Sequence, residues 1–226
     1  MPAGIGFGTE AMASTHGKGQ SSAVSDRSRI DWHSMDSKFG SSNILKLACQ
    51  VGLAFEERGF PYCWIGGVAV QRWAKPRQTV DVDAMIFAGF GVEKSICTQL
   101  LKIYPSRVEQ PLQLAVEGRI VLLQDEMGTG IDISLGGLPY EQRVVERSSD
   151  WEVPEHGKIR TCCPEDLIVM KAIANRGQDW IDIDNTMTRQ NRKLDKRLIL
   201  GELRPLVELK EEPEIMDQLE QLFAQH

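Results

Sequence analysis

The pattern of hydrophobic and polar positions becomes regular at residue 43 and changes character near residue 162. Between these two points, short apolar runs alternate with stretches in which apolar residues recur every three or four positions. From Pro164 onward only the second pattern continues. Because short apolar runs suit buried strands and the wider spacing suits amphipathic helices, the sequence predicts an α/β core over residues 43–162 and a helical C-terminal region over residues 163–226.

The α/β core is expected to be a mixed β-sheet flanked by helices. Its helices are predicted over residues 43–59, 66–73 and 92–104, and its strands over residues 62–65, 79–87, 119–123, 131–135, 151–153 and 158–162. In the C-terminal region, helices are predicted over residues 164–177, 178–189, 195–210 and 213–224.

Residues 1–42 lack any periodic apolar pattern and contain 6 Gly and 9 Ser. Such a composition buries too little apolar surface to offset the entropy of ordering the chain. We therefore expect this segment to be a disordered extension.

Composition and charge limit the classes of protein to which this chain can belong. The chain has 226 residues and a formal net charge of −6, and no run approaches the roughly 20 apolar residues of a membrane helix. The expectation is a cytoplasmic protein without a membrane partner, in which any contact with nucleic acid is confined to local basic patches. The five cysteines form no C-x-x-C pair, so buried thiols are expected rather than a zinc site or a disulfide framework.

Three aspartates carry the clearest sign of chemistry. In the strand predicted over residues 79–87, alternation places Val80 and Val82 on one face, and Asp81 and Asp83 on the other. Asp132 stands inside a later apolar strand, where an isolated carboxylate is costly without a partner or a metal ion. Three such carboxylates suit Mg²⁺, and two ions held together are the arrangement that phosphoryl transfer uses.

Two glycines precede these acids. Gly66 and Gly67 let backbone N–H groups approach a triphosphate closely, and the helix that follows them favours an anion at its N-terminus. Arg77, which lies close to Arg72 and Lys75, adds positive charge that would suit a triphosphate or an RNA end, although a solvated turn is the plain alternative.

Taken together, these motifs resemble the DNA polymerase β-type nucleotidyltransferase superfamily, in particular its AbiEii-like toxin branch. The resemblance rests on W-I-G-G-V-A-V-Q-R-W-A, on R-Q-T-V-D-V-D and on I-D-I-S. The segment P-E-D-L-I-V-M-K-A-I-A-N-R-G-Q-D-W-I-D-I, residues 164–183, is similar to that branch's helical motifs. The resemblance spans about residues 60–190.

The resemblance implies a role for each matching residue. Metal binding and catalysis fall to Asp81, Asp83 and Asp132, and Lys171 would reach the phosphates of the nucleotide. The residues implied in nucleotide contacts or in the family's last motif are Gly66, Gly67, Thr79, Asp179 and Asp182. Two departures stand out: Gly67 replaces the commoner serine, and Gln178 replaces a basic residue.

Plainer interpretations remain for several of these residues. Lys171 also fits a surface lysine on an amphipathic helix, and Asp179 and Asp182 also fit acids at a helix N-terminus. A basic run, Arg189 to Arg197, fits either a nucleic-acid contact or a solvated helix junction.

The sequence thus predicts Mg²⁺-dependent transfer of a nucleoside monophosphate from an NTP to a hydroxyl acceptor. The resemblance suggests an RNA acceptor such as a tRNA 3′ end, or a protein, and a toxin with a cognate antitoxin. Two alternatives stay open: a small-molecule nucleotidyltransferase of the aminoglycoside-modifying kind, and a non-catalytic nucleotide-binding module.

Overall fold

A six-stranded mixed sheet forms the centre of the described chain. The computed structural model describes residues 32–226, with side-chain surroundings from Asn43 onward. The strand order is β3-β4-β2-β1-β6-β5, in which β2–β4 and β1–β6 are parallel and the other neighbours antiparallel. The strands are β1 (Tyr62–Trp64), β2 (Asp81–Phe87), β3 (Ile120–Gln124), β4 (Gly130–Gly136), β5 (Ser149–Val153) and β6 (Gly157–Thr161). The mixed sheet confirms the predicted fold class.

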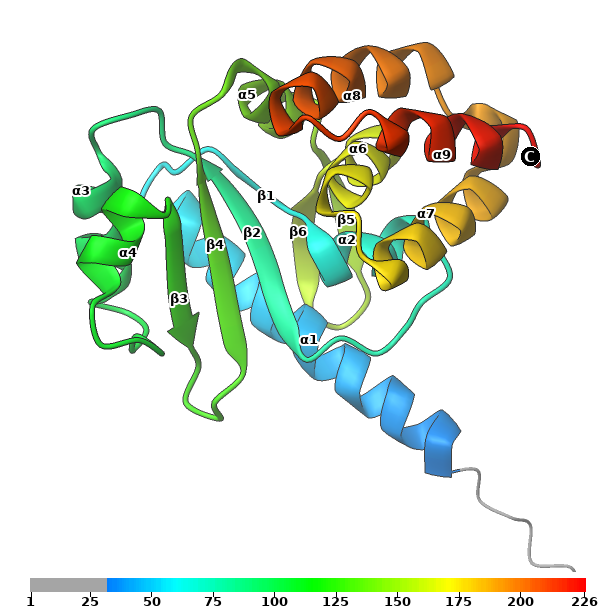
Figure 1. The fold of residues 1–226 in the computed structure, drawn as a ribbon. Coiled ribbons are helices and arrows are strands. Elements are labelled where there is room, and N and C mark those ends of the chain that lie inside the picture. The colour runs from blue at the N-terminus through cyan, green and yellow to red at the C-terminus, as the bar shows by residue number, and fades with distance from the viewer. Residues whose placement is uncertain (1–31) are drawn as a thin grey trace, which may run out of the picture. The chain divides into compact units, whose positions relative to one another are not determined.

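Helices cover both faces of this sheet (Figure 1). Those of the core are α1 (Trp32–Glu56), α2 (Gly66–Trp73), α3 (Glu93–Leu100), α4 (Pro111–Glu117) and α5 (Pro139–Glu146). Those of the C-terminal region are α6 (Pro164–Ala174), α7 (Gly177–Gln190), α8 (Lys196–Lys210) and α9 (Glu214–Phe223), with a 3₁₀ turn, η1 (Asn191–Lys193), between α7 and α8.

The two faces of the sheet belong to two hydrophobic clusters. Val82, Ala84 and Ile86 of β2 pack with α1, α3 and α4 in the first cluster. Met85 points the other way and packs with α2 and α5 to α9 in the second. Since side chains alternate along a strand, Asp81 and Asp83 share the face of Met85, which is the face covered by the C-terminal helices.

The helical region completes the second cluster. Every described strand ends before Cys162, and every described element from Pro164 onward is helical. Leu167 and Ile168 of α6 pack in the same cluster as Met85 and Ala69 from the sheet side. The helices after residue 163 therefore share a core with residues 43–162.

Three local features differ from the sequence prediction. Val80 lies before β2 with 73% of its surface exposed, so it does not share the buried face of Val82. The first helix starts at Trp32 rather than near residue 43, because glycine and serine weaken a helix without ending it as proline does. The short helices α4 and α5 were not predicted, since seven or eight residues give too few turns for a periodic pattern. The rest of the predicted extension, residues 1–31, lies outside the described residues.

Four of the five cysteines are buried free thiols, and the fifth, Cys163, is partly exposed and caps α6. Within residues 32–226, no helix has the length and apolar character that crossing a membrane requires.

Candidate active site

Three carboxylates meet on the face of the sheet that the C-terminal helices cover. In the parallel β2–β4 ladder, Asp83 pairs in register with Asp132, while Asp81 lies two residues earlier on the same face of β2. One oxygen from each carboxylate lies within 4.8 Å of the others. Among the described residues, this is the one group of His, Cys, Asp and Glu side chains with that geometry. The predicted triad is therefore assembled in space.

The environment of the triad makes it unfavourable for all three carboxylates to be ionised at once. Burial, followed by the charges of Asp81 and Asp132, raises the pKa of Asp83, against a hydrogen bond from the Gly67 N–H. Burial also raises the pKa of Asp132, opposed by an ion pair with Arg107. A bound cation would relieve this repulsion, because it interacts favourably with every member of the group.

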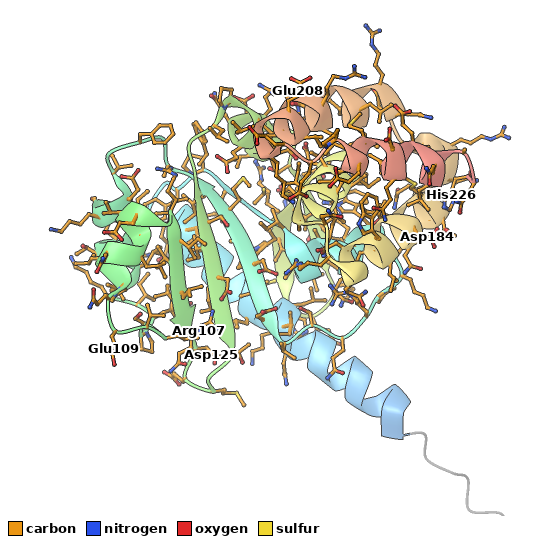
Figure 2. All side chains as sticks on the ribbon, in the orientation of Figure 1. Arg107, Glu109, Asp125, Asp184, Glu208 and His226 are labelled. Atoms are coloured by element: carbon orange, nitrogen blue, oxygen red, sulfur yellow. The ribbon has the colours of Figure 1, made fainter. Side chains whose placement is uncertain are left out.

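Arg107 is a member of the site that no sequence motif pointed to. It lies in the segment between α3 and α4, and its backbone N–H donates to the Leu122 carbonyl of β3. Figure 2 shows Arg107 at the end of the sheet where the β3–β4 turn lies. Its guanidinium donates to the carboxylate of Asp132, 25 residues later in the chain.

Close contacts with β2 and with the segment before it leave no room for side chains at Gly66 and Gly67. Gly66 has a φ of +52°, and a Cβ there would lie 2.2 Å from Oδ2 of Asp83. A Cβ on Gly67 would lie 2.3 Å from Oγ1 of Thr79. The N-terminus of α2 can therefore approach the carboxylates only because both residues lack side chains.

A cavity of about 390 Å³ opens beside the triad. Its lining includes most of the residues predicted from the sequence, namely Gly66, Gly67, Arg77, Thr79, Asp81, Asp83, Lys171 and Asp179. Asp132 stands beside this lining within the triad, and Asp182 lies next to it, almost fully buried. Arg176, to which the sequence analysis assigned no role, also lines the cavity.

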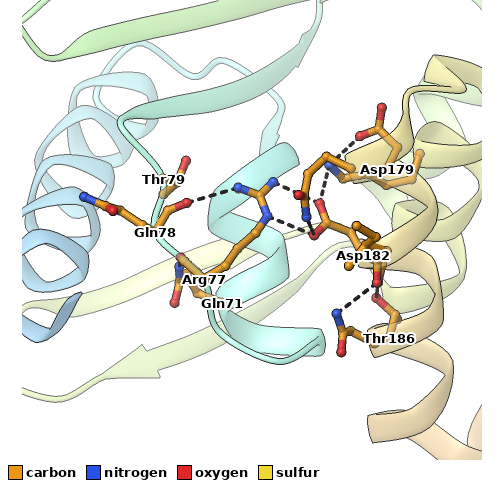
Figure 3. A network of polar contacts seen from close by, with 12 residues as sticks. Gln71, Arg77, Gln78, Thr79, Asp179, Asp182 and Thr186 are labelled. Atoms are coloured by element: carbon orange, nitrogen blue, oxygen red, sulfur yellow. Dashed lines mark hydrogen bonds and ion pairs between the residues drawn. The ribbon is translucent and has the colours of Figure 1, made fainter. Parts of the chain in front are cut away.

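A buried ion-pair network closes the wall opposite β2 (Figure 3). The Lys171 ammonium lies 2.8 Å from a carboxylate oxygen of both Asp179 and Asp182. Asp182 also accepts two hydrogen bonds from Arg77, at 2.8 and 2.9 Å, and Asp179 pairs with Arg176 at 2.6 Å. Lys171 is thus a buried ion-pairing residue, unlike the surface lysine of the plainer interpretation.

The cations of this network decide the ionisation of its acids. Burial acts to raise the pKa of both aspartates, but the hydrogen bonds from Arg176 and Lys171 to Asp179, and from Arg77 and Lys171 to Asp182, outweigh it. The pKa of each therefore lies below its usual value, and both acids are ionised at neutral pH.

The carboxylate triad fits a divalent metal ion. Asp81, Asp83 and Asp132 offer hard oxygen donors that converge, and their mutual repulsion is what a cation would offset. Partly exposed carboxylates also leave room for waters and substrate oxygens, which Mg²⁺ retains among its ligands.

Neither a family model nor a curated protein sequence matches this chain. Among solved structures, the antibiotic-resistance factor ANT(2'')-Ia is similar, with a TM-score of 0.52 and 13% identity, over 83% of this chain and 100% of that one. An antigenic nucleotidyltransferase-like protein from Paracoccidioides brasiliensis gives a TM-score of 0.47 and 17% identity, over 78% of this chain and 93% of that one.

A third structure, the lincosamide antibiotic adenylyltransferase LnuA bound to lincomycin, gives a TM-score of 0.39 and 20% identity, over 60% of this chain and 90% of that one. At these identities a likeness concerns the fold, and the match to ANT(2'')-Ia carries that comparison. The described chain therefore shares the fold of ANT(2'')-Ia, with a mixed sheet flanked by helices as predicted.

Proposed function

We propose that this protein is a Mg²⁺-dependent nucleotidyltransferase that moves a nucleoside monophosphate from an NTP to a hydroxyl acceptor and releases pyrophosphate. The observation that carries the proposal is the convergence of Asp81, Asp83 and Asp132 beside a cavity that is also lined by Gly66 and Gly67. Carboxylates that converge beside an N-terminal helix turn combine the two needs of phosphoryl transfer, a metal site and a phosphate site.

The triad would hold Mg²⁺, with two ions as the proposed number. When bound, the metal would neutralise charge on the triphosphate and make the acceptor hydroxyl easier to deprotonate. Asp132, the third carboxylate of the triad, would help to activate the acceptor hydroxyl, either as a metal ligand or as the base that accepts its proton.

The remaining residues would position the nucleotide. The N-terminus of α2 would receive phosphate oxygens, and Arg176, whose side chain is 74% exposed at the cavity, would add positive charge. The opposite wall of the cavity would be held by Asp182, which pairs with Arg77 and Lys171. These ion pairs would join α6 and α7 to the segment that precedes β2.

Two versions of this function differ in the molecule that accepts the nucleotidyl group. RNA, such as a tRNA 3′ end, or a protein is favoured by the motifs over residues 164–183, which resemble the AbiEii-like toxin branch and imply a cytoplasmic toxin with an antitoxin. A small-molecule acceptor is favoured by the likeness to ANT(2'')-Ia, which is described as an antibiotic-resistance factor and is matched over its whole length.

Label transfer tests the reaction and the acceptor together. The purified protein is incubated with each NTP labelled at the α-phosphate, with Mg²⁺, and with total RNA, cell lysate or a set of aminoglycosides. We expect labelled product with one acceptor class, no transfer by D81N or D83N, and normal transfer by D217N, which removes an exposed carboxylate of α9.

Transfer by D83N at the wild-type rate would contradict the proposal. Binding of Mg²⁺ and an NTP without transfer to any acceptor would also contradict it, and would support the non-catalytic module instead. For the toxin version, growth arrest on expression should disappear with D83N.

A further inference from the structure

A second positively charged surface lies where α7 turns into α8. It consists of six exposed cations, which together we name the α7–α8 corner: Arg189, Arg192, Lys193, Lys196, Arg197 and Arg204. Within residues 188–205, the only exposed acid is Asp195, whose carboxylate caps α8 by accepting from the Leu198 N–H. Two neighbouring acids are also engaged, since Glu165 accepts from the Asp195 N–H and Asp184 pairs with His226.

The cations of the corner differ from those elsewhere in the described chain. Most other described arginines form ion pairs, as Arg77, Arg107, Arg119, Arg143, Arg147, Arg160 and Arg176 do. In the corner, Arg192, Lys193, Arg197 and Arg204 have no ion pair or hydrogen bond with any described residue. The Lys196 ammonium lies 4.7 Å from the centre of the Phe223 ring, and Arg189 donates to the Ala74 carbonyl. Unpaired positive charge is thus concentrated here, in a chain with a net charge of −6.

Helix stability does not explain this placement. Lys196 and Arg197 occupy the first two positions of α8, a turn that contains no acidic residue. The helix macrodipole makes cations unfavourable at that end, because the N-terminus itself carries partial positive charge. The dipole and the cations therefore add to one positive field that faces solvent.

A shallow groove runs along the corner on α8. Its volume is about 530 Å³, and it is lined by Lys196, Arg197, Leu200, Gly201 and Arg204. Gly201 is exposed in the middle of the helix, and a Cβ there would meet nothing within 4 Å. Packing therefore does not require a glycine at this position, and glycine is unfavourable inside a helix. Because Gly201 has no side chain, the helix backbone is open between Arg197 and Arg204.

We propose that the α7–α8 corner binds the phosphodiester backbone of RNA, which would be the acceptor of the nucleotidyl group; this assignment of the acceptor rests on the proposed function. Arginine and lysine around an open groove match the phosphates, and arginine can bind each phosphate through two N–H groups. None of the exposed large hydrophobic residues lies within residues 188–205, which leaves nothing to insert into a membrane.

The separation between the cavity and the α7–α8 corner suits a polymer that contacts both of them. α7 begins at the cavity with Asp179 and Asp182, and the cations follow its last turn. A rise of 1.5 Å per residue places Gln190, the last residue of α7, roughly 12 Å from Asp182 along the helix axis, and Arg192 follows beyond that end. A small acceptor held beside the triad would not span that distance, whereas an RNA strand with its end at the triad would.

Binding is measured without NTP or Mg²⁺, so that it does not depend on catalysis. The probe is fluorescein-labelled unfractionated tRNA, followed by anisotropy from 50 to 300 mM salt with the full chain. We expect R192Q/R197Q/R204Q to bind at least about 10-fold more weakly, with a slope of log K against log salt that is smaller by about 2 to 3. The matched control K46Q/K94Q/K102Q loses the same charge from exposed lysines elsewhere and should bind as the wild type does.

Gly201 provides a second pair of variants that removes no cation. G201D places a carboxylate in the groove and should weaken binding several-fold, whereas G201A should leave it unchanged; circular dichroism confirms that each variant is folded. Equal weakening by the lysine control, no binding of RNA by the wild type, or equal binding of polyglutamate or of phosphatidylserine vesicles would overturn the proposal. If RNA binds at the corner but no NTP is transferred to any acceptor, the proposed reaction fails while the RNA surface stands.

Discussion

Arg77 and Asp182, 105 residues apart in the sequence, form a two-point ion pair with distances of 2.8 and 2.9 Å. The pair joins the segment before β2 to α7, and Asp182 is only 2% exposed. Figure 3 shows the Arg77 guanidinium between the Gln78 carbonyl, to which it also donates, and the Asp182 carboxylate of α7. Arg77 therefore helps to hold α7 in place beside the cavity, and the phosphate contact expected from the sequence stays a prediction.

Removing the carboxylate of Asp182 should destabilise the protein strongly. D182N leaves Arg77 and Lys171 without their shared acid, and the expected loss is about 3 kcal/mol, the lower end of the range for a buried pair because Arg77 is one-third exposed. Urea unfolding followed by circular dichroism measures it. E57Q, which removes half of the exposed pair between Glu57 and Arg58, should change stability by less than about 0.5 kcal/mol. Equal effects of the two substitutions would contradict the buried network.

Lys171 should make stability depend on pH in the acid range. The pKa values of Asp179 and Asp182 are lowered in the folded protein, so their contribution is present above the unfolded aspartate pKa, about 3.9, and is lost as pH falls through the folded values. In K171M the two acids lose their common cation. The stability deficit of K171M should therefore be largest at neutral pH and shrink below pH 4. K102M, which removes an exposed lysine without an ion pair in the described chain, should show a difference that does not vary with pH; a constant deficit for K171M would contradict the role of the lysine.

The sequence predicted what depends on local periodicity. Alternation along β2 placed Asp81 and Asp83 on one face, and the apolar neighbours of Asp132 placed it in a strand, so the triad followed once β2 and β4 paired in parallel. The C-terminal helices were also predicted, within one to three residues at most ends, because their apolar spacing is long and regular.

The features that the sequence did not predict are contacts between distant segments. Arg107 reaches Asp132 only because its segment lies along the outer edge of β3, and nothing local to Arg107 encodes that neighbour. In the same way, no spacing rule shows that Lys171 pairs with two aspartates beyond the end of its own helix. Val80 broke the alternation because β2 starts at Asp81, two residues later than predicted, and strand ends are set by pairing rather than by composition.

Gly67 should respond to substitution differently from a glycine elsewhere in a helix. G67A places a Cβ 2.3 Å from Oγ1 and 2.8 Å from Cβ of Thr79, so we expect a loss of about 2 kcal/mol from overpacking. The double substitution G67A/T79G removes the obstacle and should recover part of that loss. G201A, with nothing within 4 Å of the new Cβ, should instead stabilise the protein by about 1 kcal/mol. Thermal unfolding of the three variants decides the point, and equal behaviour of G67A and G201A would contradict the close approach of α2 to Thr79.

Mg²⁺ should stabilise the wild-type protein and compete with Arg107. Three carboxylates within 4.8 Å of one another repel, so D83N should be more stable than the wild type in EDTA and should gain nothing when Mg²⁺ is added. In the wild type, Mg²⁺ at 100 times its Kd should add about 2.7 kcal/mol, seen as a rise in Tm.

The Arg107 guanidinium pairs with the Asp132 carboxylate, so a metal ion bound to Asp132 would have to displace the guanidinium or share the carboxylate with it. R107Q should therefore bind Mg²⁺ more tightly than the wild type in a calorimetric titration. R160Q, which removes an arginine paired with Asp150 on the far edge of the sheet, controls for the change in net charge. If R107Q bound Mg²⁺ more weakly than R160Q does, Arg107 would be supporting the metal-binding conformation of Asp132 instead of competing for it.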